Sequence, residues 1–198
     1  MAAFDSSLWY QRAWSRHQKL VKSGQKSKAA SAYSRDAKAI QDLAVVLSWC
    51  ADHGITVNFT KKSGATFYNN VSRVDIAGRM SPERQLHSLL HECGHYLIGE
   101  RTKKDRYGMG WTAVEDANVV KTMHHRLDVL EEEFEAWYRG LKLARRLKIS
   151  LNKKRYDKTR IGQLKTYVDW AARVNGYSGG AANDEVEPPA PKKTASSV

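Results

Sequence analysis

The sequence has few cysteines and no long apolar stretch. Only two cysteines, Cys50 and Cys93, occur among its 198 residues, which is too few for the disulfide framework of a small secreted domain. No apolar run approaches the roughly 20 residues that a membrane-spanning helix needs, and the N-terminus lacks the apolar core of a signal peptide. We therefore expect a cytoplasmic protein with no membrane segment.

Acidic residues are scarce relative to basic ones. The chain has 21 Asp and Glu against 33 Lys and Arg, so its formal charge is +12 and its isoelectric point is near 9.7. This excess points to an anionic partner, either nucleic acid or an acidic protein surface. The basic residues are dispersed, however, without a nucleic-acid-binding motif or interleaved stacking aromatics. We expect weak nucleic-acid association at most, and a solubilising surface explains the charge about equally well. The residues concerned are Arg12, Arg16, Lys19, Lys22, Lys26, Lys28, Arg145, Arg146, Lys148, Lys153, Lys154 and Arg155.

Length and local composition divide the chain into three parts. A chain of 198 residues suits one domain with a substantial core, plus appendages. Residues 1–28 are typical of a basic helix followed by a short polar linker at residues 23–28. Residues 29–175 form the expected domain. From Gly176 the composition turns to Gly, Ala, Pro, Ser and charge, which predicts a disordered tail over residues 176–198.

Hydrophobic spacing predicts an α+β fold with a small, mostly antiparallel sheet packed on helices. Ile55, Val57 and Phe59 alternate as in a strand. Two more strands are expected at residues 65–68 and 71–76. Helices are expected at residues 6–22 and 30–53, from Pro82 onward, from a capping-box pattern at residues 112–115 to about residue 147 (with or without a break), and at residues 157–174.

Residues 91–95, His-Glu-Cys-Gly-His, match the HExxH pattern. On a helix, His91 and His95 are one turn apart and project from the same face, so both imidazoles can hold one metal ion. Glu92 lies beside them, where a carboxylate can take a proton from a metal-bound water. Two histidines and a later carboxylate, with the fourth position open to water, form a catalytic zinc site. The alternative is that both histidines lie on an ordinary helix surface with Glu92 as a solvated neighbour.

The surrounding segment favours a half-buried helix over that alternative. Ser81 and Pro82 form a helix start signal. Cys93 belongs to the apolar stripe of this helix and is expected to be a buried thiol, not a ligand. Gly94 costs about 1 kcal/mol relative to Ala inside a helix, which suggests that a second helix or a substrate backbone packs very close. The stripe consists of Leu86, Leu90, Cys93 and Leu97.

A third ligand can be selected from the four acids at residues 131–135. At about 100° per residue, Glu133 lies within about 60° of three small residues, which we call the small-residue stripe. Because small residues let two helices approach closely, we expect the HExxH helix to dock there with Glu133 facing the metal. Glu132 and Glu135 are expected to point to solvent, and Glu131 to lie on the opposite flank of the apolar face. The small-residue stripe is Ala136, Gly140 and Ala144, and the predicted apolar face is Leu127, Leu130, Phe134, Trp137 and Leu141.

The HExxH string followed by the segment Glu133-Phe-Glu-Ala136 resembles the gluzincin metallopeptidases, in which a later Glu in an ExxA-like motif completes the site. The wording Leu-Leu-His-Glu-x-Gly-His and the compact size look most like the small cytoplasmic gluzincins of the ImmA/IrrE type, including phage-encoded relatives. This resemblance covers about residues 55–147. It implies Zn²⁺ held by His91, His95 and Glu133, with Glu92 as general base in hydrolysis of a peptide bond in a protein substrate.

The chain departs from that group after the ligand helix. Ala136 is followed by Trp-Tyr-Arg-Gly, which leaves the subfamily and the substrate unassigned. The metzincin pattern fails, because Arg101 stands where its third histidine would be. The rival function is a zinc-containing basic regulatory or nucleic-acid-binding protein whose peptidase activity is lost or vestigial.

For other residues near the motif, both a functional and a structural role are open. Residues 99–111 lie between the two ligand helices and could form a substrate-covering loop. The oxyanion that forms during peptide hydrolysis needs a hydrogen-bond donor. Four residues are candidates for this donor, and for each of them a purely structural role is favoured. His87, one turn before His91, is expected to be a supporting or surface residue. The candidate donors are Tyr107, His124, His125 and Tyr138.

Overall fold

The computed structural model describes residues 6–61, 64–111, 116, 118–120 and 122–172. Within this part, the chain forms an α+β fold in which helices far outweigh a small sheet, which confirms the expected class. No helix in it is both long enough and apolar enough to traverse a membrane. The elements in chain order are α1 Ser7–Lys22, α2 Lys26–Asp52, β1 Thr56–Thr60, β2 Ala65–Tyr68, η1 Asn69–Val71, β3 Arg73–Ala77, α3 Pro82–Ile98, α4 Glu100–Arg106, α5 Met123–Arg146 and α6 Lys153–Ala172.

The sheet has three strands in the order β1-β3-β2. The central strand β3 pairs with β1 in parallel and with β2 antiparallel, so Val74 has Val57 on one side and Phe67 on the other. The sheet is therefore mixed, rather than mostly antiparallel. The reason is that β2 returns into β3 along one edge, and the remaining edge is filled by β1 running in the same direction as β3.

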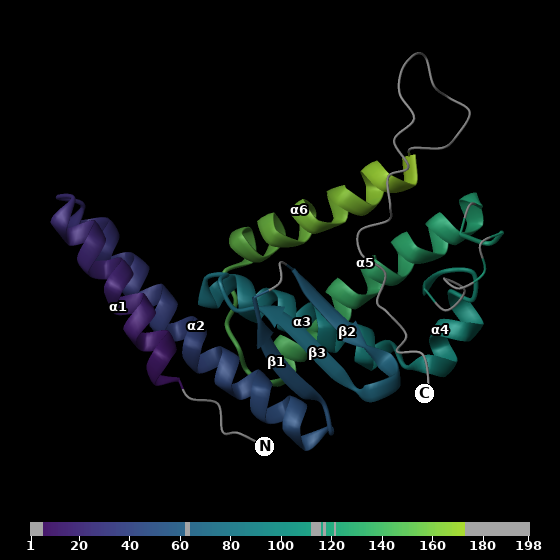
Figure 1. The fold of residues 1–198 in the computed structure, drawn as a ribbon, viewed down its shortest axis with the longest axis horizontal. Coiled ribbons are helices and arrows are strands. Elements are labelled where there is room, and N and C mark those ends of the chain that lie inside the picture. The colour runs from purple at the N-terminus through teal and green to yellow at the C-terminus, as the bar shows by residue number, and fades with distance from the viewer. Residues whose placement is uncertain (1–5, 62–63, 112–115, 117, 121, 173–198) are drawn as a thin grey trace, which may run out of the picture.

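The sheet and α2 pack on α3, which in turn packs on α5. In Figure 1 the sheet lies over α3 and α5, α1 runs back along α2 at one side, and α6 crosses on the other. One core joins these layers, and it holds both cysteines as free thiols with their Sγ atoms 3.5 Å apart. Cys93 is thus a buried thiol, as predicted. Central members of the core are Leu43, Val46, Phe67, Val74, Ile76, Leu86, Leu89, Leu90, Trp137 and Leu143.

Helices α3 and α5 approach each other at two glycines. A Cβ added to Gly94 would overlap the backbone oxygen of Ala136, and one added to Gly140 would overlap the backbone oxygen of Leu90. Any larger side chain at either position would hold the helices apart. The small-residue stripe is therefore the docking surface of the HExxH helix, as its spacing predicted.

Both helices start at side-chain caps. The hydroxyl of Ser81 accepts a hydrogen bond from the backbone N–H of Arg84 at the start of α3, as the Ser-Pro signal predicted. Helix α5 begins at Met123, where the Thr122 hydroxyl accepts from the N–H of His125. The capping-box pattern at residues 112–115 and the tail at residues 176–198 lie outside the described residues. Residues 99–111, interpreted from the sequence as a loop that could cover a substrate, contain the short helix α4.

Candidate metal centre

Three side chains from α3 and α5 bring their polar atoms to one point. The Nε2 atoms of His91 and His95 lie 3.2 Å apart. The carboxylate of Glu133 reaches both of them, with Oε2 at 3.1 Å from Nε2 of His91 and Oε1 at 3.4 Å from Nε2 of His95. The helical spacing of the two histidines and the close approach at Gly94 together produce this convergence.

These distances fit a small metal ion held by all three side chains. Donors on a tetrahedral zinc with bonds of about 2.0–2.1 Å are separated from one another by about 3.3–3.4 Å. The two imidazole nitrogens are 3.2 Å apart, and each has one oxygen of Glu133 close to it, Oε2 at 3.1 Å from His91 and Oε1 at 3.4 Å from His95. The donor set of two imidazoles and one carboxylate is also one that holds zinc at hydrolytic sites.

A fourth side chain fixes the orientation of His95. Its Nδ1 lies 3.0 Å from Oε1 of Glu132, a carboxylate that can only accept when ionised. Nδ1 therefore carries the ring proton, and in the neutral ring Nε2 presents a lone pair to the cluster. Lys103 of α4 places its Nζ at 3.4 Å from the same Glu132 oxygen and supplies the opposite charge inside the core.

The prediction for Glu132 was therefore wrong. Its side chain is fully buried, whereas Leu127 and Phe134, expected on the buried face, are 48% and 45% exposed. The error lay in choosing the buried face of α5 by hydrophobicity. This helix buries a face that carries several polar groups, because they meet the candidate metal centre and its surroundings. Glu135, half-buried, forms an ion pair with Arg139. The buried face is His125, Asp128, Val129, Glu132, Glu133, Ala136, Trp137, Gly140, Leu143 and Ala144.

Glu92 and His91 complete the cluster. His91, Glu92 and His95 offer donor atoms close enough together to share an ion, and Oε1 of Glu92 lies 3.9 Å from Nε2 of His91. Burial lowers the pKa of His91, although hydrogen bonding and charge from Glu133 oppose this shift. The ring is consequently neutral near pH 7, the form that binds metal. Trp137 stacks on it with ring centroids 4.4 Å apart and keeps one side of the imidazole dry.

Residues from outside α3 and α5 cover Glu133. The indole Nε1 of Trp111 donates to its Oε1 at 3.1 Å, and the hydroxyl of Tyr167 on α6 also hydrogen-bonds its carboxylate. Burial, followed by the nearby charges of Glu133 and Glu92, raises the pKa of Tyr167 well above 10, so this hydroxyl stays protonated and donates. The rings of Trp111 and Tyr167 meet edge to face. His91 is 8% exposed, whereas Glu92, His95, Glu132 and Glu133 are each 2% exposed or less.

The four residues considered as oxyanion donors differ in burial and partners. His124 and Tyr138 have exposed side chains, and His124 is paired with Asp128. His125 is buried, with Nδ1 2.6 Å from the backbone oxygen of Met109. Tyr107 packs on Ile98 and Ala136. His87 is buried as well, against Thr159 and Tyr156 of α6, so it is not a surface residue.

Sequence reasoning missed four residues around the centre: Trp111, Lys103, Glu132 and Tyr167. For Tyr167 a signal was present, because Tyr156, Leu164, Tyr167, Trp170 and Ala171 recur at helical spacing and define the inner face of α6. The other three depend on how α4 and residue 111 fold back over α5. Local spacing carries no signal for that arrangement.

The comparisons with known proteins give no independent assignment. No protein-family model, no curated protein and no solved structure matches the chain.

Proposed function

We propose that the protein is a zinc-dependent metallopeptidase of the gluzincin type that hydrolyses a peptide bond in a protein substrate. The observation that carries this proposal is the convergence of His91, His95 and Glu133 at separations of 3.1–3.4 Å. The resemblance to the ImmA/IrrE group supports the same assignment. Glu132 strengthens it, since a carboxylate behind a histidine is the usual support for a metal ligand.

The chain's own residues divide the work of hydrolysis. When bound, zinc would polarise the scissile carbonyl and lower the pKa of its water ligand toward 7. Glu92, buried beside His91, accepts the proton of the attacking water and returns it to the departing amine. Glu132 holds His95 in the tautomer that presents Nε2. Trp111 and Tyr167 orient the Glu133 carboxylate through their hydrogen bonds.

One observation favours the second candidate, a basic regulatory protein whose zinc is structural. His95 and Glu133 are fully buried, Glu92 is 2% exposed, and α6 lies over the centre through Tyr167. A catalytic zinc needs an open position for water and substrate. A structural zinc has no such need, so the two candidates differ in whether the bound metal turns over a substrate.

The test combines metal analysis with hydrolysis of a mixed peptide library. We expect one zinc per chain in the wild-type protein, cleavage detectable by mass spectrometry, and loss of zinc in His91→Ala. Glu92→Gln should retain zinc and lose cleavage, because Glu92 is assigned as base and not as ligand. Glu135→Gln is the matched control, since Glu135 lies on the same helix as Glu133 and forms an ion pair with Arg139, outside the cluster. Stoichiometric zinc with no cleavage by the wild type would select the structural candidate, and no stoichiometric zinc would refute both.

A further inference from the structure

A basic cavity lies on the side of α3 and α5 that faces away from the metal centre. Its volume is about 500 Å³, and it is lined by two leucines and four cationic residues, with no carboxylate among them. Leu97 follows His95 by two residues, so the two side chains leave α3 about 160° apart. The cavity is therefore not a subsite of the metal centre. Its lining residues are Leu97, Arg139, Lys142, Leu143, Arg145 and Arg146.

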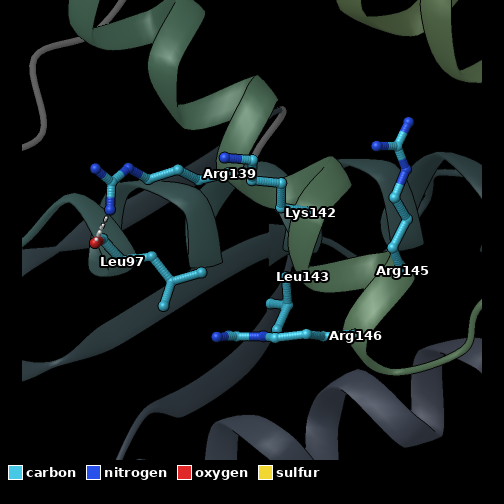
Figure 2. A pocket seen from close by; sticks show the side chains of 6 residues that line it. All are labelled: Leu97, Arg139, Lys142, Leu143, Arg145 and Arg146. Atoms are coloured by element: carbon cyan, nitrogen blue, oxygen red, sulfur yellow. Dashed lines mark hydrogen bonds between the residues drawn. The ribbon is translucent and has the colours of Figure 1, made fainter.

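The four cations differ in how they are held. Arg139 is fixed: its Nη1 donates to the backbone oxygen of Leu97 at 2.6 Å, and its Nε pairs with Glu135 at 2.7 Å. The side chains of Lys142, Arg145 and Arg146 are exposed, and no carboxylate of the described residues lies within ion-pair distance of them. In Figure 2, Arg139 and Arg146 both extend toward the Leu97 side of the cavity, whereas Arg145 points away.

The helix dipole does not account for this arrangement. Cations in the last turn of a helix are stabilised by its negative end, which explains Arg145 and Arg146. Arg139 and Lys142 lie further back, yet line the same cavity. From Arg139 to Arg146, the positive charge extends about 10 Å along the axis of α5.

An exposed aromatic ring lies next to these cations. Tyr138 is 51% exposed, and Nζ of Lys142 lies 4.3 Å from the centre of its ring. A basic groove beside an exposed aromatic ring is the combination by which proteins bind single-stranded nucleic acid: the cations follow the phosphates and a base stacks on the ring. Arginine dominates the set, and its planar fork suits phosphate oxygens.

We propose that this cavity binds the backbone of single-stranded nucleic acid, with phosphates at Lys142 and Arg146 and one base on Tyr138. The sequence suggested that the basic residues are dispersed and lack an aromatic partner. Four cations of one helix, α5, line the cavity with the two leucines, and Arg145 and Arg146 among them belong to that set. Tyr138 of the same helix lies beside Lys142. An acidic protein segment also complements the charges, and it is the alternative outcome of the experiment below. The proposal is independent of the metal centre.

The experiment measures binding of a labelled, mixed-sequence single-stranded DNA oligonucleotide to the full chain by fluorescence anisotropy over a salt series. For single strands, each phosphate contact contributes about 0.7 to the slope of log affinity against log salt. The double variant K142A/R146A should therefore lower the magnitude of the slope by about 1.4. Tyr138→Ala should weaken binding about tenfold at every salt concentration without changing the slope, because stacking releases no counterions.

The matched control is R101A/K104A, which removes two exposed charges on α4. It should change the slope by much less than K142A/R146A. Equal changes in both double variants would overturn the proposal, because binding would then follow net charge alone. A labelled acidic peptide is measured in the same way. Binding of this peptide by the wild type, with no binding of DNA, would overturn the proposal in favour of a protein partner. Glu92→Gln should bind DNA as the wild type does, whatever happens to its peptidase activity.

Discussion

Oε1 of Glu132 lies 3.0 Å from Nδ1 of His95, and both side chains are fully buried. A buried carboxylate in this position assigns the ring proton of His95 to Nδ1 and turns Nε2 toward His91 and Glu133. The same oxygen of Glu132 pairs with Lys103 at 3.4 Å. One carboxylate thus connects the candidate metal centre on α3 and α5 to the short helix α4.

The first prediction concerns how three acids of α5 rank in metal binding. Glu133→Ala removes a proposed ligand and should reduce zinc affinity most. Glu132→Gln keeps the volume but weakens the support of His95, so a loss of about 10–100-fold is expected. Glu135→Gln should change little. Competition with a chromophoric chelator measures all three, and wild-type affinity in Glu132→Gln would show that the His95 contact plays no part in binding.

The second prediction concerns the buried pair of Lys103 and Glu132. Lys103→Met leaves Glu132 without its cationic partner in the core, so the free energy of unfolding should fall by about 3–5 kcal/mol. The double variant K103M/E132Q removes both charges and should recover much of that loss. Denaturant unfolding in the presence of a chelator measures these changes apart from metal binding. Arg101→Met, at an exposed pair on the same helix, is the control and should have little effect. Additive losses in the double variant would mean that the two side chains do not stabilise each other.

The third prediction concerns the glycines between α3 and α5. Gly94→Ala and Gly140→Ala each place a Cβ against a backbone carbonyl of the other helix, so each should destabilise the protein even though Ala favours a helix. Gly162→Ala in α6 is the matched control: nothing lies within 4 Å of its added Cβ. That variant should be neutral or more stable, by up to about 1 kcal/mol. Thermal unfolding followed by circular dichroism compares the three. Equal melting temperatures would show that the helices have room to separate.

The sequence predicted the parts of this centre that depend on spacing within one helix. The pairing of His91 with His95 follows from 3.6 residues per turn, and Glu133 follows from its place on the small-residue stripe. The rest depends on the packing of elements distant in the sequence. Glu132 was expected to be solvated because the buried face of α5 was assigned from its apolar residues. That assignment fails for a helix that buries charged side chains against a site. Lys103 and Trp111 reach α5 only because residues 99–111 fold back over it. Local sequence patterns do not predict that arrangement.

The mixed sheet has a similar explanation. Alternation identified the three strands, and their observed limits differ from the expected ones by only a few residues. Alternation does not say which strand is central, however, because it describes faces and not neighbours. The placement of β3 between β1 and β2 depends on how all three pack on α3.

The last prediction concerns acid sensitivity caused by His87. Burial, followed by the positive charges of Arg155 and Arg84, lowers the pKa of His87 from 6.5 to about 4. The unfolded chain therefore takes up this proton near pH 6.5, while the folded chain takes it up only near pH 4. Stability from His87 is fully present above pH 6.5 and is lost as the pH falls toward 4. The difference between the two pKa values corresponds to about 3 kcal/mol in the free energy of unfolding, of which about 2 kcal/mol is lost by pH 5.

His87→Asn removes the titrating ring and keeps a polar group that can reach the Thr159 hydroxyl, which lies 3.0 Å from Nδ1 of His87. Urea unfolding in the presence of a chelator at pH 7 and pH 5 should show a smaller loss of stability in this variant than in the wild type, by about 2 kcal/mol. His124→Asn is the control, because the side chain of His124 is 67% exposed. The five histidines other than His87 and His124 are present in all three proteins, so the comparison isolates His87. Parallel losses in wild type and His87→Asn would mean that His87 takes up its proton at the same pH in the folded and unfolded chains.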